Sequence, residues 1–273
     1  PGTESFAEVL AAHRDQPDQA GLCARVAHGY LGRGAAEEAL DAADRALKLA
    51  PKHQLATYVL ARIHIQAGRS ERAIEMLEAC VDPEVPEPHA LNLLAGLRLQ
   101  AGEFAEAAQL YQLGAKRDPY NLRWLRALAR VALKSGDEDQ LAEILARLAP
   151  AEPDDLPIRK KLAQMALAKQ DFAAAADWAN QALGIDVTDA EIHRLFAQAE
   201  LGRHNYLKAI EELQAAVELD PKDAESRVSL ARAYAEAGKR AEARRLLEEL
   251  LRTQPDRVDA ATLLEKLEEN AEP

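Results

Sequence analysis

Apolar residues recur along this chain in pairs of short segments, each with the spacing of one helical face. Leu60 and Ile63 share one such face, and Ile74 and Leu77 form a second face after a break at Gly68. A glycine at this place favours the left-handed conformation that ends a helix, and the proline that closes the second segment stops it. Each pair of segments therefore predicts two antiparallel helices joined by a tight turn.

The pattern returns every 34 residues, which makes the chain a repeat protein. One column of small residues consists of Ala27, Ala61, Ala95, Ala129, Ala163, Ala197 and Ala231. A second column consists of Ala39, Ala73, Ala107, Leu141, Ala175, Ala209 and Ala243. The turn column between them reads Gly34, Gly68, Gly102, Gly136, Gln170, His204 and Gly238. Small residues in two columns let the paired helices approach closely, because large side chains there would hold the axes apart.

These columns, together with a proline near the end of most units, resemble the tetratricopeptide repeat (TPR) family. The resemblance covers almost the whole chain. It implies an all-α fold, a right-handed α-solenoid of antiparallel helix pairs, and a role in protein–protein interaction. Gln170 and His204 depart from the family's turn glycine, and Val187 stands where a terminal proline is usual.

We expect a single TPR solenoid over residues 1–273, because no Gly/Ser-rich linker interrupts the pattern. Full repeats are predicted to start near residues 20, 54, 88, 122, 156, 190 and 224. Residues 1–19 are read as a partial repeat, with a helix from about Glu4 to Ala12. Residues 258–270 are expected to form a capping helix with a charged outer face, as the end of a solenoid requires.

Composition narrows the functional classes. No run of apolar residues is long enough to span a membrane, and the first 20 residues do not form a signal peptide. The net charge of −12 argues against nucleic acid and anionic lipid as partners. Cys23 and Cys80 are expected to be buried free thiols. The chain begins with Pro1, so we expect a fragment or processed product, and both the cytoplasm and the periplasm are compatible with it.

No motif for catalysis, for a metal or for another cofactor is found. The seven histidines lack the spacing of zinc ligands, and neither a phosphate-binding glycine loop nor a nucleophile elbow is present. We therefore expect a protein that is not an enzyme and needs no cofactor. Trp124 and Trp178 are expected to pack between adjacent helices.

The resemblance also implies a binding groove, lined by the second, fifth, ninth and thirteenth residues of each repeat. Of these 28 positions eight are basic and three acidic, which reverses the balance of the whole chain. Arg123, Arg126, Arg130 and Lys134 place four cations along one stripe of a single helix. The candidate peptide-binding residues are Tyr58, Arg62, Asn92, Arg123, Arg126, Arg130, Lys134, Lys160, Gln164, Arg194 and Gln198.

Two interpretations of these cations stand side by side. They could be paired with acidic residues of neighbouring helices, or they could hold an acidic peptide, since the guanidinium group binds a carboxylate through two hydrogen bonds. We favour the second interpretation, in which Arg residues bind ligand carboxylates. Hydrogen bonds to the ligand backbone are then expected from Asn92, Gln164 and Gln198, and Tyr58 is expected to pack against an apolar side chain of the ligand. A C-terminal carboxylate receptor is not supported, because Leu195 stands where that subclass has Asn.

The sequence thus predicts a monomeric, non-catalytic scaffold that binds an extended acidic segment in a basic groove. The alternative is an accessory TPR segment of a larger enzyme or secretion/assembly protein, in contact with its own chain.

Overall fold

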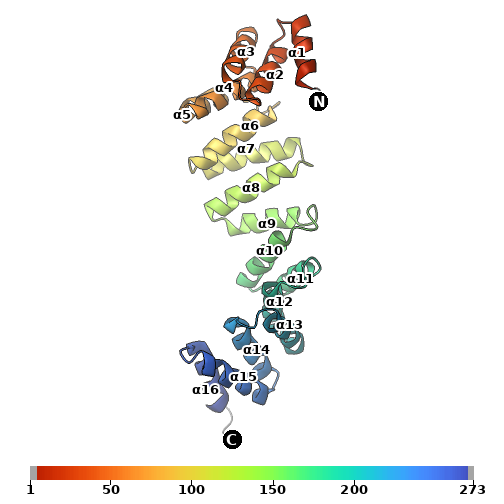
Figure 1. The fold of residues 1–273 in the computed structure, drawn as a ribbon, viewed down its shortest axis with the longest axis vertical. Coiled ribbons are helices and arrows are strands. Elements are labelled where there is room, and N and C mark those ends of the chain that lie inside the picture. Colours follow the sequence, from red (N-terminus) through yellow and green to blue (C-terminus); the bar gives the residue numbers. More distant parts are fainter. Residues whose placement is uncertain (1–4, 270–273) are drawn as a thin grey trace. The chain divides into compact units, whose positions relative to one another are not determined.

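A computed structural model describes residues 5–269, and this part of the chain consists of helices and connecting turns (Figure 1). Its sixteen helices are α1 (Phe6–Asp15), α2 (Ala20–Leu31), α3 (Ala36–Leu49), α4 (Gln54–Gln66), α5 (Ser70–Glu78), α6 (Pro88–Gln100), α7 (Phe104–Arg117), α8 (Leu122–Ser135), α9 (Glu138–Leu148), α10 (Leu156–Ala168), α11 (Phe172–Leu183), α12 (Ala190–Gly202), α13 (Tyr206–Leu219), α14 (Ala224–Glu236), α15 (Arg240–Thr253) and α16 (Val258–Glu269). The all-α fold class is confirmed.

The chain divides into two compact units, unit 1 (residues 1–141) and unit 2 (residues 142–273), and α9 contains the division. Within unit 1, α2 packs on α3, α4 on α5 and α6 on α7 as antiparallel pairs. Within unit 2, α10 packs on α11, α12 on α13 and α14 on α15 in the same way. The repeating helix pair is therefore as predicted, while the single solenoid over 1–273 stays a prediction.

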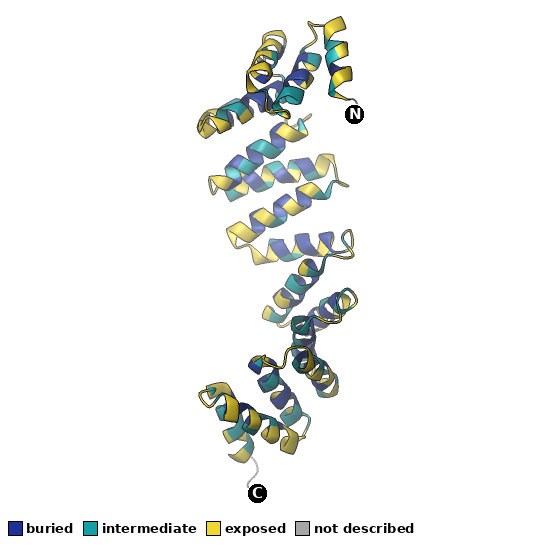
Figure 2. Cartoon of the chain, viewed as in Figure 1, coloured by how far each residue is buried: buried dark blue, intermediate teal, exposed yellow. Residues whose placement is uncertain are grey.

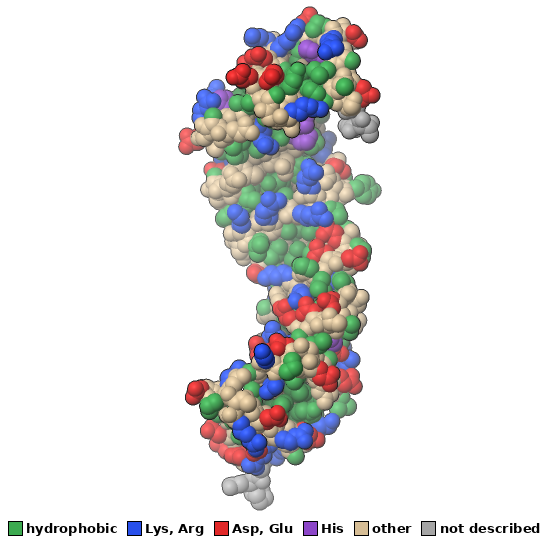
Figure 3. All heavy atoms as spheres, viewed as in Figure 1, with side chains coloured by type: hydrophobic (Ala, Val, Ile, Leu, Met, Phe, Trp, Pro, Cys, Tyr) green, Lys and Arg blue, Asp and Glu red, His purple; other side chains and the backbone are tan. Residues whose placement is uncertain are grey.

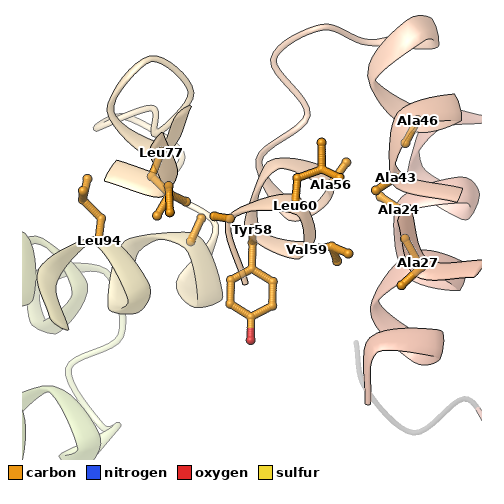
Figure 4. Packing of buried hydrophobic residues seen from close by; sticks show 14 of the residues in the cluster. Ala24, Ala27, Ala43, Ala46, Ala56, Tyr58, Val59, Leu60, Leu77 and Leu94 are labelled. Carbon is orange, nitrogen blue, oxygen red and sulfur yellow. The ribbon is translucent and has the colours of Figure 1, made fainter. Parts of the chain in front are cut away.

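The core of each unit lies between its packed helices, whose facing sides are buried while the opposite sides are exposed (Figure 2). In unit 1 the small-residue columns meet there: Ala27, Ala39, Ala61 and Ala73 are all fully buried. Figure 4 shows Ala27 among the alanines of this core. Their methyl groups allow close approach of the helix axes, and the fully buried Leu77 of α5 belongs to the same core.

The turn column has one backbone conformation throughout, with or without glycine. Gly68 has φ +74°, and the other four turn glycines have φ between +74° and +82°. Gln170 and His204 both have φ +59°, the left-handed region that side chains with a Cβ rarely adopt. Gln170 and His204 therefore adopt the same turn as the glycines, at the cost of backbone strain.

The terminal helices differ slightly from the predicted ranges. The side chain of Ser5 accepts a hydrogen bond from the backbone of Glu8, whose own carboxylate accepts from the Ser5 backbone, so α1 begins at Phe6 and runs to Asp15. Glu4 lies outside the described residues. The predicted capping helix corresponds to α16, and residue 270 of its expected range also lies outside the described residues.

Two expectations from composition can be compared with the structure. Cys23 and Cys80 are buried free thiols, as predicted. None of the helices within residues 5–269 has both the length and the apolar character that a membrane crossing needs.

Candidate functional site

The predicted basic stripe lies on α8, a helix with clear signals at both ends. The side chain of Asn121 accepts a hydrogen bond from the backbone N–H of Arg123 (3.2 Å), and Gly136 ends the helix in the left-handed conformation. One face of α8 is buried through Leu125 and Leu128. The other is exposed and carries Arg123, Arg126, Arg130 and Lys134, and Lys and Arg side chains form a row over α8 in Figure 3.

Most of these cations have no carboxylate partner in the described part of the chain. Arg126 takes part in an interaction within the chain. Among residues 5–269, Arg123, Arg130 and Lys134 form no ion pair with a carboxylate. Arg130 instead lies near the phenol of Tyr111, whose pKa burial raises while the charge of Arg130 acts in the opposite direction. Three of the four cations on α8 are therefore available to an external anion.

Helices α4 and α6 bring further predicted residues to α8. A cavity of about 90 Å³ is lined by Tyr58 and Arg62 from α4, Asn92 from α6 and Arg123 from α8. A second cavity of about 360 Å³ shares Arg62 and Asn92 and reaches Arg130. We call this surface the basic groove, and it consists of Tyr58, Arg62, Asn92, Arg123, Arg126, Arg130 and Lys134; Arg126 and Lys134 lie on the same exposed face of α8 but line neither cavity.

Within the basic groove, Arg62 is held by a neighbour without being neutralised. Its Nη1 donates a hydrogen bond to the hydroxyl oxygen of Tyr58 (3.3 Å), and it has no carboxylate partner within the described chain. Tyr58 itself is 9% exposed, so only a small part of its ring reaches the surface. Its predicted role as a contact for an apolar side chain stays a prediction, and the hydrogen bond keeps its hydroxyl beside Arg62.

Several residues that line the two cavities are absent from the sequence-based set. His89 lies beside Asn92 in the first cavity, and Gln100 and Tyr111 line the second. His89 also belongs to a ring cluster with His28 and Tyr58. His28, His89 and Gln100 occupy groove positions of the repeat, and that register is the signal that could have found them.

The predicted residues of unit 2 have a different environment. Lys160 forms ion pairs with Asp189 (2.8 Å) and with Glu191. Burial disfavours the charged form of Lys160, but hydrogen bonds to these two carboxylates outweigh it and raise the pKa of Lys160. Gln164 donates to Glu191 (2.9 Å). Lys160 thus follows the ion-pair interpretation.

The remaining residues of unit 2 agree with this. Arg194 pairs with Glu225 (2.8 Å), a carboxylate of the following repeat. Gln198 is half-buried on the same helix. Leu195 is 4% exposed and belongs to the core, so a C-terminal carboxylate receptor has no polar side chain at that position. The structure therefore does not show the predicted residues as one set: seven lie in unit 1 and four in unit 2.

Comparison with known sequences decides the family. The tetratricopeptide repeat profile matches residues 30–97, 98–165 and 200–267, and each match spans two of the 34-residue periods. The chain belongs to the tetratricopeptide repeat family. No curated protein has a sequence that matches this chain.

Solved TPR structures have the same fold at low sequence identity. YrrB, described as a TPR protein with an unusual peptide-binding site, is 16% identical with a TM-score of 0.55, over 65% of this chain and 91% of YrrB. A MamA structure is 19% identical with a TM-score of 0.52, over 62% of this chain and 92% of MamA. A MamA fragment from Desulfovibrio magneticus RS-1 is 16% identical with a TM-score of 0.50, over 63% and 97% of the two chains. At these identities the likeness establishes the TPR fold.

Proposed function

We propose that this TPR protein binds an extended acidic polypeptide segment in the basic groove of unit 1 and acts there without catalysis. Membership of the TPR family makes the chain a scaffold for protein–protein interaction. The proposal adds the chemical class of the ligand and the surface that holds it. The ligand is a stretch of Asp and Glu residues, and its main contacts are Arg62, Arg123, Arg130 and Lys134.

The observation that carries the proposal is the unpaired state of these four cations in an acidic protein. The chain has 46 acidic and 34 basic residues, so carboxylates are abundant. Lys160 and Arg194 of unit 2 have taken such partners, whereas Arg62, Arg123, Arg130 and Lys134 have none within residues 5–269. Like charges along one helix destabilise it by a few tenths of a kcal/mol per pair. An external anion relieves this repulsion, which favours binding.

The groove also has the chemistry to hold a peptide. A guanidinium group can donate two parallel hydrogen bonds to one carboxylate, which gives direction as well as charge attraction. Asn92 lines the first cavity together with Arg62 and Arg123, and an amide side chain can bond to the backbone of a ligand. Leu93 and Trp124 line the same cavity and offer apolar contact. YrrB, with the same fold, is described as having a peptide-binding site, which supports a peptide as the ligand.

Lys160, Gln164, Arg194 and Gln198 stay proposed contacts of a secondary kind. A ligand carboxylate at Lys160 competes with Asp189 and Glu191, and one at Arg194 competes with Glu225. Since each exchange replaces one ion pair by another, the net gain is small. We therefore assign the larger share of affinity to the groove of unit 1.

The test is charge reversal in the groove with a matched control outside it. Arg123→Glu combined with Arg130→Glu is expected to weaken binding of a Glu/Gly peptide by about tenfold or more and to reduce its salt dependence. The control is Arg72→Glu with Arg117→Glu, which makes the same change in net charge in unit 1 at residues already paired with Glu75 and Glu84. Equal weakening by both double variants, or unchanged affinity in the groove variant, would refute the proposal.

A further inference from the structure

Three aromatic rings from three different helices meet at one edge of the basic groove. The ring centroids of His28 (α2) and His89 (α6) lie 5.0 Å apart. Tyr58 (α4) lies 5.8 Å from His28 and 5.4 Å from His89. Figure 4 shows the Tyr58 ring extending out of α4, away from the buried alanines. The repeat register places all three at groove positions, so the cluster belongs to the proposed ligand-binding surface.

The charged groups around His28 come from α4, from α6 and from the residue before α6. Arg62 of α4 and His89 of α6 disfavour protonation of His28, and Glu87, the N-cap residue of α6, favours it. Burial is the largest influence, and the pKa of His28 lies below its ordinary value as a result. The carboxylate of Glu87 is already engaged, since it accepts a hydrogen bond from the backbone of Ala90 (2.7 Å).

The other helices packed on α2 present mainly apolar groups to it. Helix α1 places Phe6 against Gly29, beside His28, while its titratable His13 contacts Cys23 farther along α2 (3.5 Å between Nε2 and Sγ). Helix α3 packs its alanine column on α2, and its Arg45, paired with Asp18 (3.0 Å), acts on Cys23. The charged groups that influence protonation of His28 are therefore those on the groove side, namely Arg62, His89 and Glu87.

His89 lies in a comparable but more open position. It is exposed, and it lines the first cavity together with Arg62 and Arg123. When both imidazoles are protonated, the cluster contains two imidazolium rings beside the guanidinium of Arg62, with Glu87 as the nearby carboxylate. An added carboxylate would attract all three cations and accept N–H bonds from the rings.

This arrangement couples proton uptake to ligand binding. We propose that His28 and His89 form a proton-coupled subsite of the basic groove, which binds a carboxylate side chain of the ligand more tightly as the pH falls from about 8 to about 6. The inference rests on the proposed function, because it assigns a pH response to the same site.

The sign follows from linkage. An anion at the subsite stabilises the protonated rings, so carboxylate binding and proton uptake favour one another. Affinity then rises as the pH falls through the pKa of the complex, and it levels off below the pKa of the free protein. When binding shifts the protonation midpoint of one such group by one unit, the gain in affinity approaches about tenfold once the pH lies below both midpoints.

The experiment uses an acetylated and amidated peptide of alternating Glu and Gly. Its carboxylates stay ionised above about pH 6, so any change of affinity reports on the protein. Calorimetric titrations at about pH 8 and about pH 6, each in two buffers of different ionisation enthalpy, give the affinity and the number of protons taken up. For the wild type we expect binding that is tighter by about threefold or more at the lower pH, with net proton uptake.

The deciding variant is His28→Gln with His89→Gln, which keeps polar side chains but cannot be protonated in this range. We expect its affinity, whatever its value at about pH 8, to stay the same at about pH 6, with no net proton uptake on binding. The control is His204→Gln, in unit 2, where the matching turn position of another repeat already has Gln170 in the same conformation. Circular dichroism verifies that each variant is folded.

The outcomes separate the two proposals. If the wild type and the double variant show the same pH response, or if the wild type takes up no protons, the subsite is refuted while acidic-peptide binding stands. If the wild type does not bind the peptide at any pH, the proposed function fails and the subsite fails with it.

Discussion

The indole ring of Trp124 lies directly against Gly114, so that a Cβ added at Gly114 would come within 2.5 Å of the ring atom Cδ2. Trp124 is on α8 and 3% exposed, and Gly114 is on α7. The ring of Tyr111, one turn earlier on α7, lies 6.3 Å from Trp124 between centroids. Trp124 therefore packs between adjacent repeats, as predicted, and it fixes the helix that carries the basic stripe.

The first prediction concerns this contact. Gly114→Ala is expected to destabilise the protein by about 1–3 kcal/mol, because the methyl group overlaps a buried ring that cannot move without displacing α8. Chemical denaturation followed by circular dichroism measures the change. The matched control is Gly96→Ala on α6, where the nearest atom to the added Cβ is the Tyr111 hydroxyl at 3.7 Å, an ordinary contact. There we expect no loss, or a gain of up to about 1 kcal/mol from helix propensity. Equal losses at both glycines would contradict the interpretation.

The repeat architecture could be predicted because its determinants are local. The turn conformation at Gly68 and the buried methyl of Ala61 follow from single columns that recur every 34 residues. The sequence shows where the repeat pattern is broken, as at Val187, but it does not show the contacts that replace the missing residue. At the Val187 position, where proline is missing, the buried ring of His193 contacts the Val187 carbonyl (2.9 Å) and the carboxylate of Glu212 (2.6 Å). That link joins residues of two helices and one loop, so no column of the sequence reveals it.

The second prediction uses the strained turns. Gln170→Gly is expected to raise the free energy of unfolding by about 0.5–1 kcal/mol. Glycine adopts φ +59° without the steric cost that glutamine has there. The reciprocal change Gly68→Ala is expected to cost about 1 kcal/mol, although an added Cβ meets no atom within 4 Å. Thermal and urea unfolding give both values. A loss of stability in Gln170→Gly would show that the glutamine side chain contributes more than the strain removes.

The candidate site could be predicted only in part, for physical reasons. Cations at helical spacing on α8 are visible in the sequence, since the stripe lies on one element. Whether a cation is neutralised depends on a carboxylate from another repeat. Lys160 pairs with Asp189, the N-cap residue of the next groove helix, α12, and this contact depends on how the repeats stack. The approach of His28 to His89 likewise depends on how α2, α4 and α6 stack.

The third prediction concerns Arg159, a buried residue that sequence analysis did not single out. Its guanidinium donates to the backbone carbonyls of Ala149 (2.9 Å), Glu152 (3.0 Å) and Asp155 (3.1 Å), and so holds the loop between α9 and α10. Arg159→Met retains the bulk but leaves carbonyl groups unsatisfied, and we expect a loss of about 2–4 kcal/mol. The control Arg232→Met alters an exposed residue of unit 2 and should change stability by less than about 0.5 kcal/mol. Unfolding curves of the two variants compare them, and similar curves would mean that the three carbonyls are satisfied equally well by water.

The fourth prediction is a pH dependence at the start of α16. Arg257 donates from Nε and Nη2 to the two carboxylate oxygens of Asp259 (2.9 and 2.6 Å), and these bonds lower the pKa of Asp259 to about 2. A lowered pKa in the folded state adds stability above the ordinary aspartate value, and that stability is lost as the pH falls through about 2. Because the Asp259 side chain is 46% exposed, solvent screening limits the contribution to less than about 1 kcal/mol.

Asp259→Asn should therefore be less stable than the wild type by a few tenths of a kcal/mol at about pH 6, and this difference should shrink between about pH 4 and about pH 2 as Asp259 itself becomes protonated. Urea unfolding over that pH range measures it, with Asp256→Asn, an exposed neighbouring carboxylate, as the control for net charge. A difference that stays constant down to about pH 2 would mean that the ion pair with Arg257 adds nothing. The loss would then come from the hydrogen bond that the Ala260 backbone donates to Asp259 (3.0 Å), which protonation affects less than it affects an ion pair.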